Sequence, residues 1–389
     1  MRKGWEYKKL GEVLETTSGG TPSKSHKEYY EGGTIPWLRS GEVSKGDIYD
    51  AELYITEEGL KKSSAKLFPI DTVLIAMYGA TVGQVGILKS TMCTNQAICG
   101  ILPNKDFHPN FLKYVLLANK KNYLKQAIGG AQPNISQQVI KSTYIPIVKF
   151  SEQESVVSEL DKINELIRLK KEQLKDFDNL AQSIFYEMFG DPVENEMGWE
   201  VKKLNEIVSD NCSISYGIVQ PGDGIENGVP VVRPVDMTGT FVYRQGLKNT
   251  TKEISDSYKR TILKGNEILM CVRGTTGLIA MASSELRGCN VTRGITPIEC
   301  GKSCNKWFIY YQISNSSIQQ YIAEYTRGIA LKQINMKDVR DIPLCLPPLP
   351  LQHLFAQRIE QIEHQKAEVQ KSITDLETLL ASRMQYWFE

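Results

Sequence analysis

The chain contains 389 residues, of which 41% are hydrophobic and 23% are charged, as in an ordinary soluble globular protein. Its 46 Lys and Arg residues nearly balance 45 Asp and Glu residues, and the net charge of +1 excludes a basic field over the whole chain that would attract nucleic acid. The length indicates roughly two or three domains of about 150 residues each.

The N-terminal residues and the cysteines point to a cytoplasmic protein. The first ten residues, MRKGWEYKKL, contain no apolar stretch, and the longest apolar runs are too short to span a bilayer, so we expect no membrane contact. The eight Cys residues are scattered and form no CxxC pair. Reduced and mostly buried thiols are the simplest interpretation of this usage.

Residues 1–150 have the pattern of a globular domain built from short strands. A helix is predicted over residues 109–126, and the polar, turn-rich stretch GGAQPNIS follows at 129–136. The β-type runs, which Gly and Pro separate, occupy residues 34–39, 72–78, 84–88 and 96–102.

A single long helix is predicted over residues 151–190. Apolar residues step by four and three from Val156, with one polar break at Lys170, and no Gly or Pro occurs until Gly190. A period of 3.5 residues is typical of a helix that packs along another helix. The predicted seam residues of this helix are Val156, Leu160, Ile163, Ile167, Leu174, Phe177 and Ile184.

Residues 191–347 repeat the pattern of the first domain. GWEYKKL at 4–10 recurs as GWEVKKL at 198–204, an offset of 194 residues, and later matches keep their order and nearly the same spacing. A helix is expected over residues 304–324. The strands of this second domain are expected at residues 229–234, 267–273, 277–282 and 294–300.

A second long helix is predicted over residues 348–389, with the same four-and-three stepping and a length that matches the first. Apolar positions such as Phe185, Phe189 and Trp387 are expected to be exposed on the paired helices, which indicates that these helices need more cover than each other. The predicted seam residues of the second helix are Phe355, Ile359, Ile362, Val369, Ile373, Leu376 and Leu380.

The expected fold is of the α+β class. Two similar globular α/β domains are joined by two long antiparallel helices that form a coiled coil, and the internal repeat gives the chain pseudo-two-fold symmetry. Two heads that face the same way suit a target with two separated sites on one face. Duplex DNA is such a target, because half-sites about one helical turn apart, roughly 34 Å, present the same face.

Enzyme signatures are absent from the sequence. Gly301-Lys302-Ser303 resembles the end of a phosphate-binding loop, but Thr296 stands where that pattern requires Gly. Cys300 and Cys304 fit no standard zinc spacing, and we expect no metal site and no catalytic residues. Neither a GxSxG motif nor the motifs of a DNA methyltransferase occur.

Arg, Gly and amide residues recur in matched loops of both repeats. Guanidinium groups suit guanine edges and phosphates, amides suit adenine, and small residues let a backbone approach phosphate. A single residue of this kind is more often an ordinary surface side chain, so only the recurring set indicates a binding face. The candidate DNA-contacting residues are Arg39, Tyr78, Gly79, Thr81, Asn95, Gln96, Gln132, Asn134, Arg233, Arg273, Gly274, Thr276, Arg293 and Arg327.

The repeated motifs resemble those of the specificity (S) subunit of type I restriction–modification systems. The resemblance rests on WEYKKL and WEVKKL, on the Ile-Pro…Arg segments, on the Gly- and Thr-rich loops, and on the Ile-Pro before each long helix. It covers the whole chain, in order, twice. The second helix departs in one place, because Leu351 stands where the first has Glu152.

This resemblance implies a DNA-recognition subunit that is not itself an enzyme. Each domain would read one half of a bipartite target in double-stranded DNA, and the helices would set the spacer between the halves. The helices would also dock two methyltransferase (M) subunits, which two restriction (R) subunits join. The resemblance places S-adenosylmethionine, ATP and Mg on those partners and no cofactor on this chain.

Three other functions stay open at this point. A self-sufficient nuclease or methyltransferase would need the catalytic motifs that the sequence lacks. A coiled-coil adaptor with protein-binding heads, or the specificity module of another methyltransferase or nuclease system, would share the predicted architecture.

Overall fold

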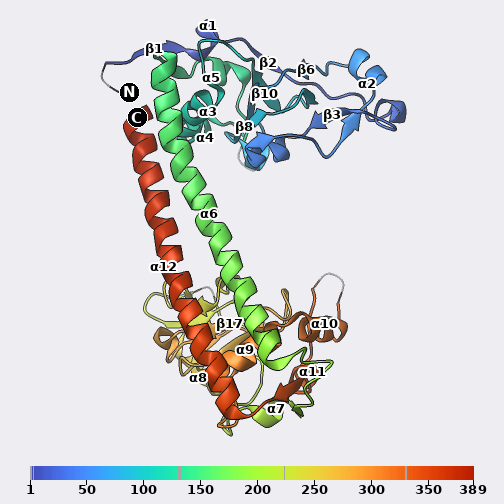
Figure 1. Ribbon diagram of the computed structural model, residues 1–389, viewed down its shortest axis with the longest axis vertical. Coiled ribbons are helices and arrows are strands. Elements are labelled where there is room, and N and C mark those ends of the chain that lie inside the picture. Colours follow the sequence, from blue (N-terminus) through green and yellow to red (C-terminus); the bar gives the residue numbers. More distant parts are fainter. Residues whose placement is uncertain (1, 3, 130–132, 223, 329–330) are drawn as a thin grey trace. The chain divides into compact units, whose positions relative to one another are not determined.

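The computed structural model describes residues 2, 4–129, 133–222, 224–328 and 331–389 (Figure 1). It divides into two compact units. Unit 1 comprises Met1–Lys171 and Lys371–Glu389, and unit 2 comprises Glu172–Gln370. The boundaries therefore cut through both long helices rather than falling at their ends, and the predicted division at residues 150, 190 and 347 stays a prediction.

Unit 1 contains the first globular domain, built from two mixed sheets and a strand pair. The strand orders are β2-β10-β7-β8-β4, β5-β3-β9-β6 and β1-β11. The strands are β1 (Glu6–Lys9), β2 (Thr16–Ser18), β3 (Ile35–Leu38), β4 (Asp47–Ile48), β5 (Tyr54–Ile55), β6 (Leu67–Phe68), β7 (Val73–Ala76), β8 (Val85–Leu88), β9 (Met92–Thr94), β10 (Ile98–Ile101) and β11 (Tyr144–Ile147). The helices of this domain are α1 (Leu10–Val13), α2 (Glu57–Lys61), α3 (Pro109–Ala118), α4 (Lys120–Gln126) and α5 (Gln137–Lys141).

Unit 2 contains the second globular domain and repeats this arrangement. The strand orders β14-β17-β16-β19, β15-β13-β18 and β12-β20 correspond to those of unit 1. The strands are β12 (Glu200–Lys203), β13 (Val229–Val232), β14 (Phe241–Val242), β15 (Lys248–Thr250), β16 (Ile268–Cys271), β17 (Ile279–Ala282), β18 (Asn290–Val291), β19 (Ile295–Ile298) and β20 (Pro343–Leu346). The helices of this domain are α7 (Leu204–Ile207), α8 (Lys252–Ser257), α9 (Lys306–Ser314), α10 (Ser316–Glu324) and α11 (Met336–Arg340).

The recurring sequence motifs meet in space within each unit. The EYKK strand β1 pairs antiparallel with the Ile-Pro strand β11, so that Tyr7 lies opposite Pro146. In unit 2, β12 pairs with β20 in the same way, with Lys203 opposite Pro343. The pairing explains why the two motifs recur together, since each provides the hydrogen-bonding partner of the other.

The helix expected at residues 109–126, and its counterpart at 304–324, are each broken into two. The break falls at Asn119 between α3 and α4, where the side-chain Nδ2 donates to the carbonyl of Val115 at 2.9 Å. In unit 2 it falls at Asn315, whose extended backbone and side-chain oxygen cap α10. Asparagine favours such breaks because its amide competes with the helical backbone hydrogen bonds.

The long helices α6 (Phe150–Phe189) and α12 (Leu349–Phe388) each contain 40 residues, so their predicted match in length is confirmed. Within unit 1, Lys171 Nζ lies 2.8 Å from Glu377 Oε1, and Arg383 pairs with Glu159 further along. Residue numbers rise on one helix as they fall on the other, which confirms the predicted antiparallel packing. The early part of α6 inserts into the core of the first domain, where Val156 and Leu160 are fully buried.

The expectation that the long helices need more cover than each other is confirmed at Phe185 and Phe189, although both side chains are buried rather than exposed. These side chains are 2% and 3% exposed in the core of unit 2. Both pack against Phe308 of α9 and Phe355 of α12, with ring centroids 4.8–5.7 Å apart. They fall outside the strict seam because α6 contacts the domain core as well as its partner helix.

A buried glutamine in the first turns of each long helix ties that helix to the short helix of its domain. Gln153 is fully buried, accepts from the His108 amide at 2.8 Å and donates to two backbone carbonyls. Gln352, its counterpart, accepts from the Asn305 amide at 2.9 Å and donates to the Pro347 carbonyl at 2.8 Å. This shared role gives the matched glutamines of the repeat a structural reason.

Candidate nucleic-acid interface

The ends of two parallel strands bring candidate residues together in each domain. In unit 1, β3 and β9 run parallel with Leu38 opposite Thr94, so the next residues, Arg39 and Asn95, lie at the same edge. In unit 2, β13 and β18 are parallel with Val232 opposite Val291. Arg233 and the segment that holds Arg293 therefore leave the sheet side by side.

Arg39 and Arg233 occupy equivalent positions, and each is paired with carboxylates of its own loop. Arg39 Nη2 lies 2.6 Å from Glu52 Oε2, and the backbone amide of Arg39 donates to Glu42. The Arg233 guanidinium binds both oxygens of Asp236, at 3.0 and 2.7 Å, and these hydrogen bonds raise the pKa of Arg233. Both arginines thus stabilise the turn after their strand, and Arg39 keeps a side chain that is about half exposed.

The glycine loops are part of the internal framework of each domain. Gly79 has φ +72° and Gly274 has φ +87°, a backbone conformation that glycine adopts without strain. Their amides donate to the carbonyls of Pro133 and Lys332, both at 2.8 Å. Both glycine amides thus already have acceptors within their domain, and the close approach of these loops to phosphate stays a prediction.

A hairpin docks against each glycine loop and presents side chains beside it. In unit 1, Asn134 forms β-bridges with both Tyr78 and Ile128. Tyr78 and Ile128 are 41% and 81% exposed. Thr81 lies in the same loop and donates its hydroxyl to the Tyr78 carbonyl at 3.2 Å. The candidate residue Gln132 lies outside the described residues.

The hairpin of unit 2 reproduces this arrangement around Gln333. Gln333 forms β-bridges with Arg273 and Arg327, and its side chain donates to the Tyr216 hydroxyl at 3.3 Å. Thr276 accepts a hydrogen bond from the hydroxyl of Thr326, which lies in the segment after α10. Gln333 and Tyr216 are candidates that the sequence reasoning missed. The position of Gln333, which is equivalent to that of Asn134 in the first repeat, was a usable signal.

Arg273 differs from the other candidate arginines in its hydrogen bonding. Its Nε is buried, and it has no hydrogen-bond partner among the described residues. Arg293 sits at the matching strand end, half-buried, with its amide donating to the Ile218 carbonyl at 2.7 Å. A buried guanidinium nitrogen without a partner is costly, so a ligand that accepts from it would be favoured.

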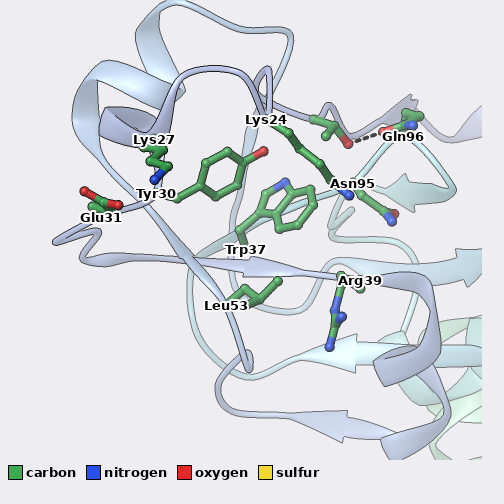
Figure 2. Close-up of a pocket in the computed structure, with 10 residues that line it drawn as sticks. Lys24, Lys27, Tyr30, Glu31, Trp37, Arg39, Leu53, Asn95 and Gln96 are labelled. Atoms are coloured by element: carbon green, nitrogen blue, oxygen red, sulfur yellow. Dashed lines mark hydrogen bonds between the residues drawn. The ribbon is translucent and has the colours of Figure 1, made fainter.

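A pocket of about 550 Å³ in unit 1 gathers three of the candidate residues, Arg39, Asn95 and Gln96 (Figure 2). Figure 2 shows the ring of Tyr30 beside that of Trp37, with their centroids 6.2 Å apart and nearly perpendicular. The remaining lining residues are Thr21, Lys24, Lys27, Glu31 and Leu53. A basic and aromatic pocket thus adjoins the strand ends of the first domain.

The cysteines are free and mostly buried. Burial raises the pKa of Cys93 to about 11 and that of Cys99 to about 12, so both are neutral thiols at physiological pH. Within the described parts of the chain, no group of three or more His, Cys, Asp or Glu side chains is arranged to hold a metal ion. None of the described helices is both long and apolar enough to cross a membrane.

Comparison with known families gives a match over both repeats. A family model described as the type I restriction modification DNA specificity domain matches residues 2–176 and again residues 196–378. The two matches together cover most of the chain, and each spans one globular domain with part of a long helix.

Two of the curated relatives align over nearly the full length of this chain, and a third aligns over part of it. The type I restriction enzyme MjaIX specificity subunit of Methanocaldococcus jannaschii is 25% identical, with 97% of this chain and 91% of the relative aligned. The EcoBI specificity subunit of Escherichia coli is 22% identical, with 96% and 82% aligned. The EcoR124I/EcoR124II specificity subunit of Escherichia coli is 30% identical over 41% of each chain.

Two solved structures share the fold over the whole chain. One comes from work on complex assembly and conformational transition of a type I restriction–modification system, with TM-score 0.60, 19% identity, and coverage of 100% of this chain and 98% of that one. The other is the S subunit of such a system from M. genitalium, with TM-score 0.54, 14% identity and the same coverage. At these identities the likeness establishes the fold.

Proposed function

The chain belongs to the type I restriction modification DNA specificity family, whose domain it contains twice, and we propose that each domain reads one half of a bipartite DNA target. The observation that carries this proposal is the matched interface of the two units. In each, a strand end with an arginine, a glycine loop and a hairpin lie together.

The residues that differ between these matched interfaces are suited to reading different bases. Tyr78 of unit 1 corresponds to Arg273 of unit 2, Asn134 to Gln333, and Gln96 to Arg293. Arginine suits guanine and amides suit adenine in the major groove. A common framework with different exposed side chains is what two half-sites of unlike sequence require.

The chain would give specificity to partner enzymes and perform no catalysis itself. Its curated relatives are named specificity subunits of restriction enzymes, and its own sequence lacks the motifs of a nuclease or methyltransferase. S-adenosylmethionine, ATP and Mg would then be bound by two methyltransferase and two restriction subunits. The location of the complex would be the cytoplasm, where its DNA is found.

The long helices would dock the methyltransferase subunits and set the spacer between half-sites. Each helix has 40 residues, which corresponds to about 60 Å at 1.5 Å per residue. Several leucines of these helices are about half exposed. Their exposure does not stabilise an isolated chain, whereas a docked partner would bury them. They are Leu166, Leu169, Leu180 and Leu379.

Reconstitution with an adenine methyltransferase subunit tests the proposal. The mixture should methylate a bipartite sequence and protect it from a methylation-sensitive nuclease, whereas neither protein alone should do so. Methylation or cleavage by the isolated chain would show that it is an enzyme. Tight binding of the heads to another protein, without sequence-specific protection of DNA, would favour the coiled-coil adaptor.

A further inference from the structure

The pocket of unit 1 that Figure 2 shows has the features of a binding site for a single nucleotide. We propose that this pocket receives one base that leaves the DNA duplex when the first domain binds its half-site, an inference that rests on the proposed function. The base would lie against Tyr30, above the buried Trp37, and its flanking phosphate would face Lys24 and Lys27.

The aromatic walls of the pocket are fixed before any ligand arrives. The Trp37 indole nitrogen donates to the Gly20 carbonyl at 2.9 Å, and the Tyr30 hydroxyl donates to the Pro22 carbonyl at 2.5 Å. Both rings are therefore held against one short stretch of chain. Aromatic and apolar side chains are the surfaces on which enzymes and binding proteins hold unstacked bases.

Two amide side chains stand at the polar edge of the pocket. The Asn95 oxygen accepts from the Ala97 amide at 3.2 Å, and the Gln96 oxygen accepts from the Thr21 hydroxyl. These contacts orient both side chains through their oxygens and leave the amide nitrogens as donors, with no partner among the described groups. Amide donors suit the carbonyl and ring-nitrogen acceptors of a base edge.

The charge around the pocket favours a phosphate. Lys24 and Lys27 are exposed and form no salt bridge with any described residue, whereas Arg39 is neutralised by Glu52. Glu31 is the one carboxylate among the lining residues. In a chain with a net charge of +1, two unpaired lysines beside an aromatic pocket form a local attraction for a nucleotide.

The pocket distinguishes the first domain from the second. Trp37 lies opposite Cys93 in the β3–β9 pair, and the equivalent position of the β13–β18 pair is Val231, opposite Asn290. Valine does not supply the aromatic support that the buried Trp37 gives to the ring of Tyr30. The two half-sites would thus be read differently, and only that of the first domain would contain a displaced base.

Fluorescent base analogues placed at each position of the target test this inference in the complex with its methyltransferase. Such analogues brighten when they leave the base stack. We expect a several-fold rise at one position in addition to the methylated base. Lys24→Gln and Asn95→Ala should abolish that additional rise, whereas Lys62→Gln, an exposed lysine of the same domain, should preserve it.

The possible outcomes separate this inference from the proposed function. If the complex protects its target but no additional position brightens, or the rise survives both pocket variants, the pocket inference is wrong while the proposed function stands. If the complex shows no sequence-specific protection, both fail. A free deoxynucleoside monophosphate that binds by calorimetry and loses affinity in Lys24→Gln, without any DNA position brightening, would assign the pocket to a free nucleotide and overturn the inference.

Discussion

The arginines of the candidate interface differ in the hydrogen-bond and ion-pair partners that they already have. Arg39 and Arg233 pair with carboxylates of their own loops, so part of their role is to fix a turn. Arg273 has a buried Nε without a described partner and lies next to the hairpin that carries Gln333. Of the three, Arg273 is therefore the one whose side chain gains most from a hydrogen-bond acceptor on DNA.

Arg273→Ala should weaken specific binding of the reconstituted complex by about 1–3 kcal/mol if the side chain reads a base. Discrimination at one base pair of the second half-site should relax at the same time. Titrations at several salt concentrations provide the measurement, and Arg287→Ala, an exposed arginine of the same unit, provides the control. An equal loss on all sequences, with a shallower salt dependence, would instead identify a phosphate contact.

Gln352 can be tested for its structural role. Gln352→Leu leaves the Asn305 amide and the Pro347 carbonyl without their buried partner, and each loss should cost about 1–3 kcal/mol. Denaturant unfolding should show this destabilisation, while Gln357→Leu on the exposed face of the same helix should change stability little. A Gln352→Leu variant as stable as the parent would show that these hydrogen bonds contribute nothing net.

Sequence reasoning reached some of these residues and not others for a physical reason. Arginines and amides in matched loops can be found from a repeat, because their positions are sequential. The contacts of Arg233 with Asp236 and of Gly79 with Pro133 depend on how turns close, and the short-range pattern does not reveal that. Gln333 was missed, although its position in the repeat matches that of Asn134, because its β-bridges with Arg273 and Arg327 appear only in the fold.

At the scale of elements, the seam of the long helices and most strand positions follow from periodicity and from Gly and Pro punctuation. The breaks at Asn119 and Asn315 could not be predicted, since the apolar spacing continues across each asparagine. The parallel pairing of β3 with β9 was equally hidden, because strands distant in sequence carry no local mark of their partner. That pairing places Arg39 and Asn95 at the same edge of the sheet.

The end of α12 is held to α6 by Glu159, which accepts hydrogen bonds from Arg383 and from the Trp387 indole. The Arg383 hydrogen bond is the main cause that lowers the pKa of Glu159 below its ordinary value of 4.5, against the opposing effect of burial. A carboxylate with a lowered pKa stabilises the folded state above its unfolded pKa, and this stabilisation is lost as the pH falls through the folded pKa.

Glu159→Gln should therefore lower stability at pH 7 by about 1 kcal/mol, a modest value because the pair is about one third exposed. The difference in Tm between parent and variant should shrink as the pH falls below about 4.5. Thermal unfolding followed by tryptophan fluorescence measures it, with Glu165→Gln at an exposed pair as control. A difference that is constant from pH 7 to pH 3 would exclude the ion pair as its cause.

At the scale of the whole molecule, one unit has been used twice, and the helices are the part that belongs to both copies. Each compact unit takes one end of α6 and one end of α12 into its core. A change in a globular domain should therefore act on one half-site, whereas a change in both helices should act on the distance between half-sites. The two properties are separable by design.

Insertion of one heptad into both α6 and α12, near residues 171 and 371, tests the role of the helices as a spacer. Seven residues keep the 3.5-residue seam in phase and add about 10 Å, which is roughly 3 bp of duplex DNA. Mapping of methylated motifs should show a spacer lengthened by that amount, or loss of methylation, with the bases of both half-sites unchanged. Insertion into α6 alone is the control, since it puts the two seams out of register and should abolish activity. Altered half-site bases with the original spacer would show that the helices do not set the distance.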